Sequence, residues 1–373
     1  MSLLSFFTGR SRTTFKYLHP LNPELHREIL IGRRSTVEAA VDDLLDNTPI
    51  CISAPRLSGK TTMLFLVAAE LRQRASEWSP LFVDLQGIEP DSTAGVAREI
   101  LLMLREYAKG IEGGSQLSIP EESDLQVVFE AVLGGDFGRI VLLLDGVDAI
   151  DTETTVSAVK LLKAAISRTV LKRGELVCPF VLTGALDLAL RGQSNALNVA
   201  RTIYLEDFSA TEVSELLQRV SRNAFFEDAA AAVHRLSGGH PRLVQHLAAL
   251  AYARMNKEER KSVDRHDVEQ AAKRLIEQND HLFATTLELL ERHGVTREFL
   301  DKVQSEDVPF TRLRADVLTA EQVGIIRGEA GVCRLRNPLF ADLLNVVGPR
   351  QPKPAPKEPT APHKPAAPKE PTP

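Results

Sequence analysis

The chain has 373 residues, of which 43% are hydrophobic and 25% charged, and its formal net charge is −5. This length suits about two or three domains, and the acidic balance argues against a general attraction to nucleic acid or anionic lipid. Three cysteines, an odd number, do not indicate a disulfide framework. No apolar run is long enough for a membrane helix, and the apolar segment at residues 3–7 is too short for a signal sequence. We therefore expect a cytoplasmic protein in which Cys51 and Cys178 are buried and reduced.

An alternation of strands and helices dominates the first half of the chain. Residues 1–30 are expected to be a mostly irregular lead-in that ends in a short helix. Strands are predicted at 50–53, 81–85, 140–144, 179–183 and 203–205, and helices at 37–45, 63–74, 94–108, 123–133 and 155–171. This order predicts an α/β fold over residues 31–208, with a parallel sheet covered by helices on both faces. Ligands of such sheets bind at the carboxyl ends of the strands.

A phosphate-binding loop lies between the first predicted strand and its helix. Residues 50–62 read ICISAPRLSGKTT, which matches the pattern G-x-x-x-x-G-K-[ST] except that alanine replaces the first glycine. In this motif the lysine reaches the β- and γ-phosphates and the following hydroxyl binds Mg²⁺, while backbone N–H groups surround the phosphates. The candidate nucleotide-binding residues are Ala54, Ser58, Gly59, Lys60, Thr61 and Thr62. The alternative interpretation is an ordinary strand-to-helix turn without a ligand.

A second motif supports the first one. Residues 140–148 read IVLLLDGVD, an apolar run that is typical of a strand buried on both faces and that ends in Asp145. Alone, Asp145 could equally be a helix cap or a turn residue. Together with Lys60 and Thr61 it predicts a magnesium site whose protein ligands are Thr61 and Asp145.

The strands stop after residue 208, and an all-α lid is predicted at 209–256. Ser209 and Glu212 have the spacing of a capping box. Helices are expected at 210–220, 227–236 and 241–253. Between the last two helices stands SGGHP, in which a glycine ends one helix and Pro241 begins the next.

The remaining chain divides into a folded part and a tail. Residues 257–346 are predicted to form a winged-helix domain, with helices followed by two short strands and a turn that contains Gly328 and Gly331. The tail at 347–373 is rich in Pro, Lys and Ala and repeats APKEPT. Such a composition predicts a disordered, extended segment.

Taken together, these motifs resemble the STAND and origin-recognition-type AAA+ ATPases over about residues 20–346. The resemblance is carried by Ile31-Gly32-Arg33, the phosphate loop, the DGVD strand end, the GGHP junction and the closing RLRNPLF. It implies that Gly32 and Arg33 line an adenine pocket, and that His240, Pro241 and Arg242 face the nucleotide. The plainer interpretations are a helix N-terminal turn for the first segment and a helix–helix junction for the second.

The resemblance also implies roles in hydrolysis. Thr183 would sense the γ-phosphate, and Arg201 stands where related ATPases place an arginine that acts in trans, although an ordinary surface arginine fits there too. The glutamate that usually follows the magnesium aspartate is replaced by Gly146, and an acid reappears at Asp148, as in the D-G-x-D form of NACHT-type STAND proteins. Asp148 is a candidate base, and a loop role stays open. The predicted catalytic residues are Lys60, Asp145, Asp148 and Thr183.

The expected function is an ATP-binding switch with slow hydrolysis, which uses ATP or ADP with Mg²⁺. Sensing and output would come from protein partners in trans, with a nucleotide-dependent homo-oligomer and no membrane. The alternatives are a DNA-associated initiator or transposition-type ATPase and a scaffold that binds nucleotide without hydrolysing it. A winged helix would favour DNA, with Arg327, Arg334 and Arg336 as the local basic cluster. However, residues 280–346 hold eleven acidic and eight basic side chains, whereas DNA-reading modules usually present a basic face.

Overall fold

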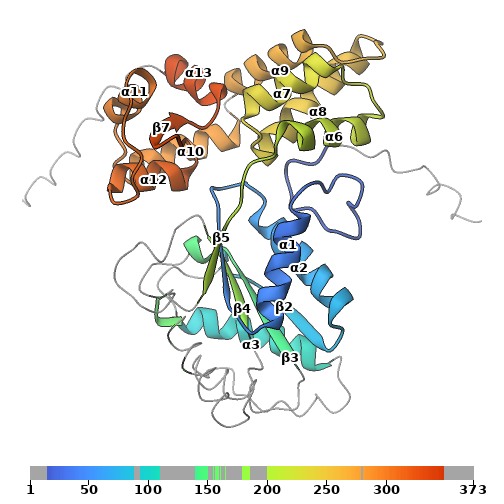
Figure 1. The fold of residues 1–373 in the computed structure, drawn as a ribbon, viewed down its shortest axis with the longest axis vertical. Coiled ribbons are helices and arrows are strands. Elements are labelled where there is room, and N and C mark those ends of the chain that lie inside the picture. The colour runs from blue at the N-terminus through green and yellow to red at the C-terminus, as the bar shows by residue number, and fades with distance from the viewer. Residues whose placement is uncertain are drawn as a thin grey trace, which may run out of the picture.

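The computed structural model describes residues 15–87, 93–109, 139–149, 179–184 and 200–347, without residue 279 and with a few positions between 154 and 164. Figure 1 shows a lower layer built on a sheet and an upper layer of helices. The predicted helix at 123–133, most of that at 155–171, Cys178 and the tail beyond Val347 lie outside the described residues.

The lower layer is a five-stranded parallel sheet in the order β2-β3-β4-β1-β5. Its strands are β1 (Ile50–Ser53), β2 (Trp78–Asp84), β3 (Arg139–Asp145), β4 (Phe180–Gly184) and β5 (Arg201–Tyr204), and its helices are α1 (Arg34–Leu45), α2 (Lys60–Arg74) and α3 (Thr93–Lys109). Every residue of β1 and β4 is buried, as is typical of mainly apolar strands in the middle of a parallel sheet. The predicted α/β fold is confirmed. Strand β2 begins three residues earlier than predicted, because Pro80 is tolerated in a strand at the edge of a sheet.

The first part of the upper layer is a bundle of helices joined to β5. It contains α6 (Ala210–Ser221), α7 (Glu227–Ser237), α8 (Pro241–Lys257) and α9 (Arg265–Glu277). The capping box is present, since the Ser209 side chain accepts from the Glu212 N–H and the Glu212 side chain accepts from the Ser209 N–H. Gly238 ends α7 with a φ of 61°, and Pro241 opens α8. Helix α9 packs against α7 and α8, so all four helices share one core.

The second part of the upper layer combines helices with a small hairpin. It contains α10 (His281–Arg292), α11 (Arg297–Ser305), α12 (Ala315–Val323), β6 (Ile326–Glu329), β7 (Val332–Leu335) and α13 (Pro338–Val347). Strands β6 and β7 are antiparallel, and Ala330 and Gly331 turn between them with φ values of 48° and 80°. Gly328 was predicted in this turn but lies within β6. A Cβ at Gly328 would stand 2.6 Å from the Phe310 ring, so the ring packs directly on its backbone.

The lead-in differs from its prediction in one respect. We name residues 15–31 the N-terminal strap. The short helix expected at its end is wrong, because residues 23–29 form turns in which the Asn22 side chain accepts hydrogen bonds from the N–H groups of Glu24 and Leu25. Asparagine competes in this way with the helical pattern. Phe15 and Leu21 are buried in the apolar core of the upper layer, so the strap is anchored there.

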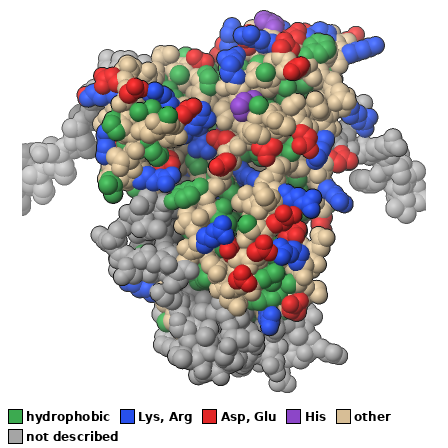
Figure 2. Space-filling model, in the orientation of Figure 1, with side chains coloured by type: hydrophobic (Ala, Val, Ile, Leu, Met, Phe, Trp, Pro, Cys, Tyr) green, Lys and Arg blue, Asp and Glu red, His purple; other side chains and the backbone are tan. Residues whose placement is uncertain are grey.

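The surface carries no large field of one charge on the face drawn in Figure 2, where acidic and basic side chains are interspersed. Among the described residues, no helix is long and apolar enough to cross a membrane. Cys51 is buried and forms no disulfide with another described residue, as expected.

Candidate nucleotide-binding site

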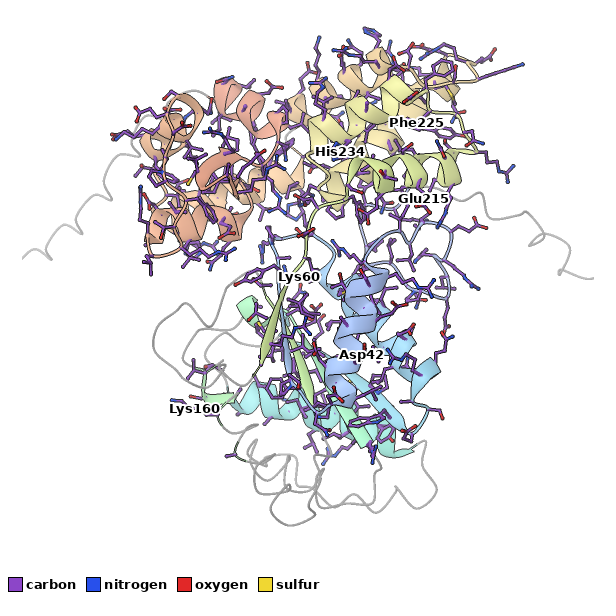
Figure 3. The ribbon with its side chains drawn as sticks, viewed as in Figure 1. Asp42, Lys60, Lys160, Glu215, Phe225 and His234 are labelled. Atoms are coloured by element: carbon purple, nitrogen blue, oxygen red, sulfur yellow. The ribbon has the colours of Figure 1, made fainter. Side chains whose placement is uncertain are left out.

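The phosphate loop connects β1 to α2 at the edge of the sheet that faces the upper layer, where Figure 3 labels Lys60. Gly59 has a φ of 84° and directly precedes α2, whose N-terminus carries a partial positive charge. The Lys60 ammonium donates to the carbonyls of Ala54 and Pro55, each at 3.0 Å. The side chain of Lys60 therefore lies across the concave side of its own loop, within reach of an anion bound there.

Thr61 and Asp145, the two predicted metal ligands, are in contact. The Thr61 hydroxyl donates to Asp145 Oδ2 at 2.6 Å, and the Asp145 side chain is buried at the end of β3. Hydroxyl and carboxylate oxygens are hard ligands that suit Mg²⁺, which usually takes one or two protein ligands together with phosphate oxygens and water. The part of the chain that is described holds no cluster of three or more His, Cys, Asp or Glu side chains for a metal. The residues present therefore fit an ion that arrives with phosphates.

Thr183 supports the same carboxylate from β4. Its hydroxyl donates to Asp145 Oδ1 and accepts from the Gly146 N–H at 3.1 Å, and its side chain is fully buried. These contacts orient Asp145; a role of Thr183 in sensing the γ-phosphate stays a prediction. Asp148 follows in a 3₁₀ turn at Val147–Ala149, but its side chain lies outside the described part of the structure. Its role as a base also stays a prediction.

Gly32 and Arg33 lie between the loop and the lid. Both have left-handed backbones, with φ values of 65° and 62°. The Arg33 guanidinium donates to the Ser58 carbonyl at 2.7 Å and to the Gly59 carbonyl at 3.3 Å. Burial lowers the pKa of Arg33 to about 10, against the opposing effect of nearby acids, so the group stays charged at neutral pH. A side chain on Gly32 would overlap the Glu212 carboxylate, whose Oε1 would be 2.1 Å from the added Cβ.

The GGHP junction of the lid contacts the loop from the other side. His240 is buried, and its Nε2 lies 3.3 Å from the Arg56 carbonyl. Burial lowers the pKa of His240 to about 4, so the ring is neutral at physiological pH and Nε2 must carry the proton that faces this carbonyl. Pro241 and Arg242 line the adjoining cavity, and Arg242 donates to the Tyr17 carbonyl at 2.7 Å.

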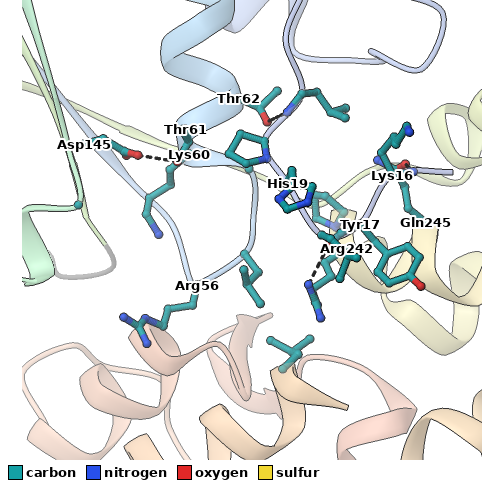
Figure 4. A pocket seen from close by; sticks show the side chains of 18 of the residues that line it. Lys16, Tyr17, His19, Arg56, Lys60, Thr61, Thr62, Asp145, Arg242 and Gln245 are labelled. Atoms are coloured by element: carbon teal, nitrogen blue, oxygen red, sulfur yellow. Dashed lines mark hydrogen bonds between the residues drawn. The ribbon is translucent and has the colours of Figure 1, made fainter. Parts of the chain in front are cut away.

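A cavity of about 450 Å³ joins these elements (Figure 4). Of the predicted site residues, it is lined by Arg33, Gly59, Lys60, Thr61, Thr62, Asp145, Pro241 and Arg242. The other described members of this set are not among its lining residues: Gly32, Ala54, Ser58, Thr183 and His240. The volume is within the range of sites for small ligands and cofactors.

The sequence-based predictions missed the strap as a wall of this cavity. Tyr17 and His19 line the cavity, and the strap is hydrogen-bonded to both layers of the fold. The Leu21 N–H donates to the Thr62 hydroxyl at 3.0 Å, and the Lys16 N–H donates to the Gln245 side chain at 2.7 Å. Thr62, which was predicted to bind phosphate, therefore holds the strap. An irregular segment has no periodic pattern that could have indicated these contacts.

Arg201 lies away from this cavity. It begins β5 beside Ile50, at the amino end of the sheet, and forms an ion pair with Asp43 at 2.6 Å. Within this chain Arg201 therefore lies at the amino ends of the parallel strands, whereas Lys60 lies at their carboxyl ends. A role of Arg201 in a neighbouring copy stays a prediction.

No known family model and no curated protein matches this sequence. Solved structures match it in fold. A Walker-type ATPase of Pyrococcus abyssi superposes with a TM-score of 0.62 at 18% identity, over 88% of this chain and 99% of that chain. The ORC2 protein of Aeropyrum pernix, solved in ADPNP–ADP complexes, does so with a TM-score of 0.51 at 13% identity, over 91% and 98%. The chain thus has the P-loop fold of Walker-type and origin-recognition-type ATPases.

Proposed function

We propose that this protein binds ATP with Mg²⁺, hydrolyses it slowly, and uses the bound nucleotide as a switch. The support comes from three side chains at one end of the cavity. Lys60 is held across the phosphate loop, and Thr61 and Asp145 offer adjacent oxygens to a cation. Mg²⁺ held by these two residues would neutralise charge on the phosphates. Because no guanine-specific Asn-Lys-x-Asp motif is present, the favoured base is adenine.

Slow turnover is proposed because Gly146 follows the aspartate at the metal site. Its φ of 76° would strain a glutamate there, and the Gln86 side chain, 2.7 Å from the position of an added Cβ, would have to move. Asp148 is then the nearest candidate acid in the sequence. A group that polarises the attacking water typically contributes 10²- to 10⁴-fold, so a displaced base would keep hydrolysis slow.

The proposed switch is supported by the walls of the cavity, which come from the sheet layer, the lid and the C-terminal helices. Lys60 comes from the sheet layer, Arg242 from the lid, and Thr286 and Val323 from α10 and α12. A ligand in contact with all three stabilises one arrangement of them, and it shifts the population by its differential affinity for that arrangement. We infer that ATP and ADP favour different positions of the upper layer, which would expose or cover a surface for oligomerisation or for a partner protein.

We further propose that the predicted winged-helix domain of residues 257–346 forms a winged helix from residue 280 onward, because α9 packs in the core of the lid, and that the protein is of the STAND type, with signalling partners supplied in trans. Three helices followed by an antiparallel hairpin support the first point, and the DGVD sequence supports the second. The cytoplasmic location stays a prediction.

A DNA-associated ATPase is the second candidate, favoured by the same helices and hairpin. Against it stands the pairing of the predicted basic cluster. Arg334 bonds Asp307 at 2.6 Å and Arg327 bonds Glu329 at 3.3 Å, while Arg336 is buried against Asp207. These ion pairs reduce the charge that the hairpin could offer to phosphates.

Isothermal titration of the full chain with ATP and Mg²⁺ tests the main proposal. Lys60→Ala should weaken ATP binding at least tenfold, because the ammonium that faces the phosphates is lost. Lys257→Ala, at an exposed position at the end of α8, is the matched control and should bind like the wild type. Equal ATP affinity for all three proteins, or no binding by the wild type, would overturn the proposal.

A further inference from the structure

The geometry points to Arg33 as a positioning residue that sets affinity for phosphate groups through the backbone of the phosphate loop, and not as a reader of the adenine base. This inference rests on the proposed nucleotide binding. It differs from the role that the sequence resemblance implied, in which Arg33 lines the adenine pocket.

The guanidinium of Arg33 contacts the backbone of the phosphate loop. Arg33 Nη2 donates to the Ser58 carbonyl and Nη1 to the Gly59 carbonyl, so the fork of the side chain holds two consecutive peptide groups. A trans peptide is planar, with its C=O and N–H pointing in opposite directions. When Arg33 holds these carbonyls, it also directs the N–H groups of Gly59 and Lys60 away from itself, toward the concave side of the loop. Those are the groups that surround phosphates in this motif.

Arg33 lies between the phosphate loop and Phe208. The side chain passes over the Phe208 ring, with the guanidinium carbon 5.6 Å from the ring centre, and its Nε is buried without a hydrogen-bond partner among the described residues. Its backbone has a φ of 62° and a ψ of 3°, a left-handed conformation that is uncommon for arginine. An uncommon backbone conformation and a buried charge thus occur together at one residue, whose guanidinium contacts the loop at Ser58 and Gly59 and also donates to the Glu206 carbonyl at 3.5 Å.

The backbone of Arg33 also makes a clean experiment available. Glycine adopts a left-handed conformation without steric cost, so Arg33→Gly removes the side chain without straining the turn. Arg33→Lys keeps the positive charge but loses the two-pronged fork. Arg34→Ala is the matched control, because the neighbouring Arg34 side chain is 91% exposed and pairs with Glu38 on the surface of α1.

ATP, ADP, GTP and adenosine are competed against a fluorescent ADP analogue on the full-length proteins. Arg33→Gly should lose at least tenfold in affinity for ATP and ADP, and Arg33→Lys should lose an intermediate amount. Adenosine affinity should change less than about twofold, and the ratio of ATP to GTP affinity should stay that of the wild type. Millimolar guanidinium chloride, but not sodium chloride, should restore ATP binding to Arg33→Gly. Arg34→Ala should match the wild type throughout.

Three results would overturn the inference. An equal loss for adenosine and ATP, or a collapsed preference for ATP over GTP, would place Arg33 on the base. Unchanged ATP affinity in both Arg33 variants would remove any role in positioning the loop. Melting temperatures of all variants are recorded, and Arg33→Lys carries the test if Arg33→Gly does not fold. Failure of the proposed function itself looks different, because the wild type would then not bind ATP.

Discussion

Arg336 and Asp207 form a two-point ion pair between the C-terminal hairpin and the segment that joins β5 to the lid. Arg336 Nε lies 2.8 Å from Oδ2 and Nη2 lies 2.9 Å from Oδ1 of Asp207, and both side chains are largely buried. Since Arg336 was predicted as part of the local basic cluster of the winged helix, this pair changes its interpretation from a possible DNA contact to an internal ion pair. This ion pair connects the hairpin region to the segment that follows β5 in the layer that holds the phosphate loop.

Removing one member of this pair should destabilise the protein strongly. An isolated buried charge costs about 3–5 kcal/mol, whereas a surface ion pair contributes about 0–1 kcal/mol. Arg336→Ala should therefore lower the melting temperature by about 4–6 °C. Arg334→Ala, which breaks the exposed pair with Asp307, should lower it by no more than about 2 °C. Equal shifts for the two variants, measured by calorimetry, would contradict a structural role for the buried pair.

Acid should destabilise the fold in part through His240. Burial lowers the pKa of His240 to about 4, below the ordinary value of 6.5. Between about pH 6.5 and pH 4 the unfolded chain therefore binds a proton at His240, whereas the folded chain does not. The contribution of His240 to the free energy of unfolding is fully present above pH 6.5 and is lost as the pH falls toward 4. In urea titrations across this window, His240→Gln should reduce the pH slope of the unfolding free energy by up to about 1.4 kcal/mol per pH unit.

The control for this experiment is the exposed His293→Gln, which should keep the wild-type slope. A parallel slope in His240→Gln and the wild type would show that His240 ionises as easily in the fold as in the unfolded chain.

Hydrolysis should be slow, with a turnover below about 1 s⁻¹. If Asp148 is the base, Asp148→Asn should reduce phosphate release by about 10²-fold or more while leaving ATP affinity within about twofold. Asp145→Asn should instead weaken the Mg²⁺-dependent part of ATP binding, because Asp145 is paired with Thr61 at the cation site. Unchanged phosphate release by Asp148→Asn would place the base elsewhere.

Binding to duplex DNA at physiological salt should be weak, about 10⁻⁴–10⁻⁶ M or worse. The reason is the acidic balance of residues 280–346 and the ion pairs of Arg327 and Arg334. The double variant Arg327→Ala/Arg334→Ala tests this without touching the buried Arg336. Nanomolar, sequence-selective binding by the wild type that this variant loses would promote the DNA-associated function above the switch.

Removal of residues 349–373 should leave the melting temperature within about 1 °C of the full chain. The last described helix, α13, buries Leu343 and Leu344 and ends at Val347, so the deletion removes none of these core residues. We expect the tail to be dispensable for ATP binding and to serve as a tether or docking segment. A large loss of thermal stability would show that the tail packs on the folded body.

Features with a local signature were predictable from the sequence. The loop around Lys60, the strand that ends at Asp145 and the junction before Pro241 each carry residue types that short-range geometry requires, and all three are where they were expected. The capping box of Ser209 and Glu212 belongs to the same class, because its two partners stand on one turn of helix.

Contacts between distant parts of the chain were not predictable. Arg336 and Asp207 are 129 positions apart, and the Lys16 N–H and the Gln245 side chain are 229 apart. Neither pair has a repeating pattern or a motif that links its members. The same holds for Arg33, whose place beside the loop was expected but whose two carbonyl partners were not. A charged side chain near a motif indicates a site, but its partner is decided by packing.

The cavity has walls from both ends of the chain, since Lys16 and Val323 both line it. During synthesis the strap leaves the ribosome about three hundred residues before α12. At about 5–20 residues per second this interval lasts roughly 15–60 s. For most of it, until α8 and α9 have been made, the strap has neither the Gln245 side chain nor the lid core to pack against. The complete wall of the cavity therefore exists only after α12 has been made, and a chain that stalls earlier lacks the side that Val323 provides.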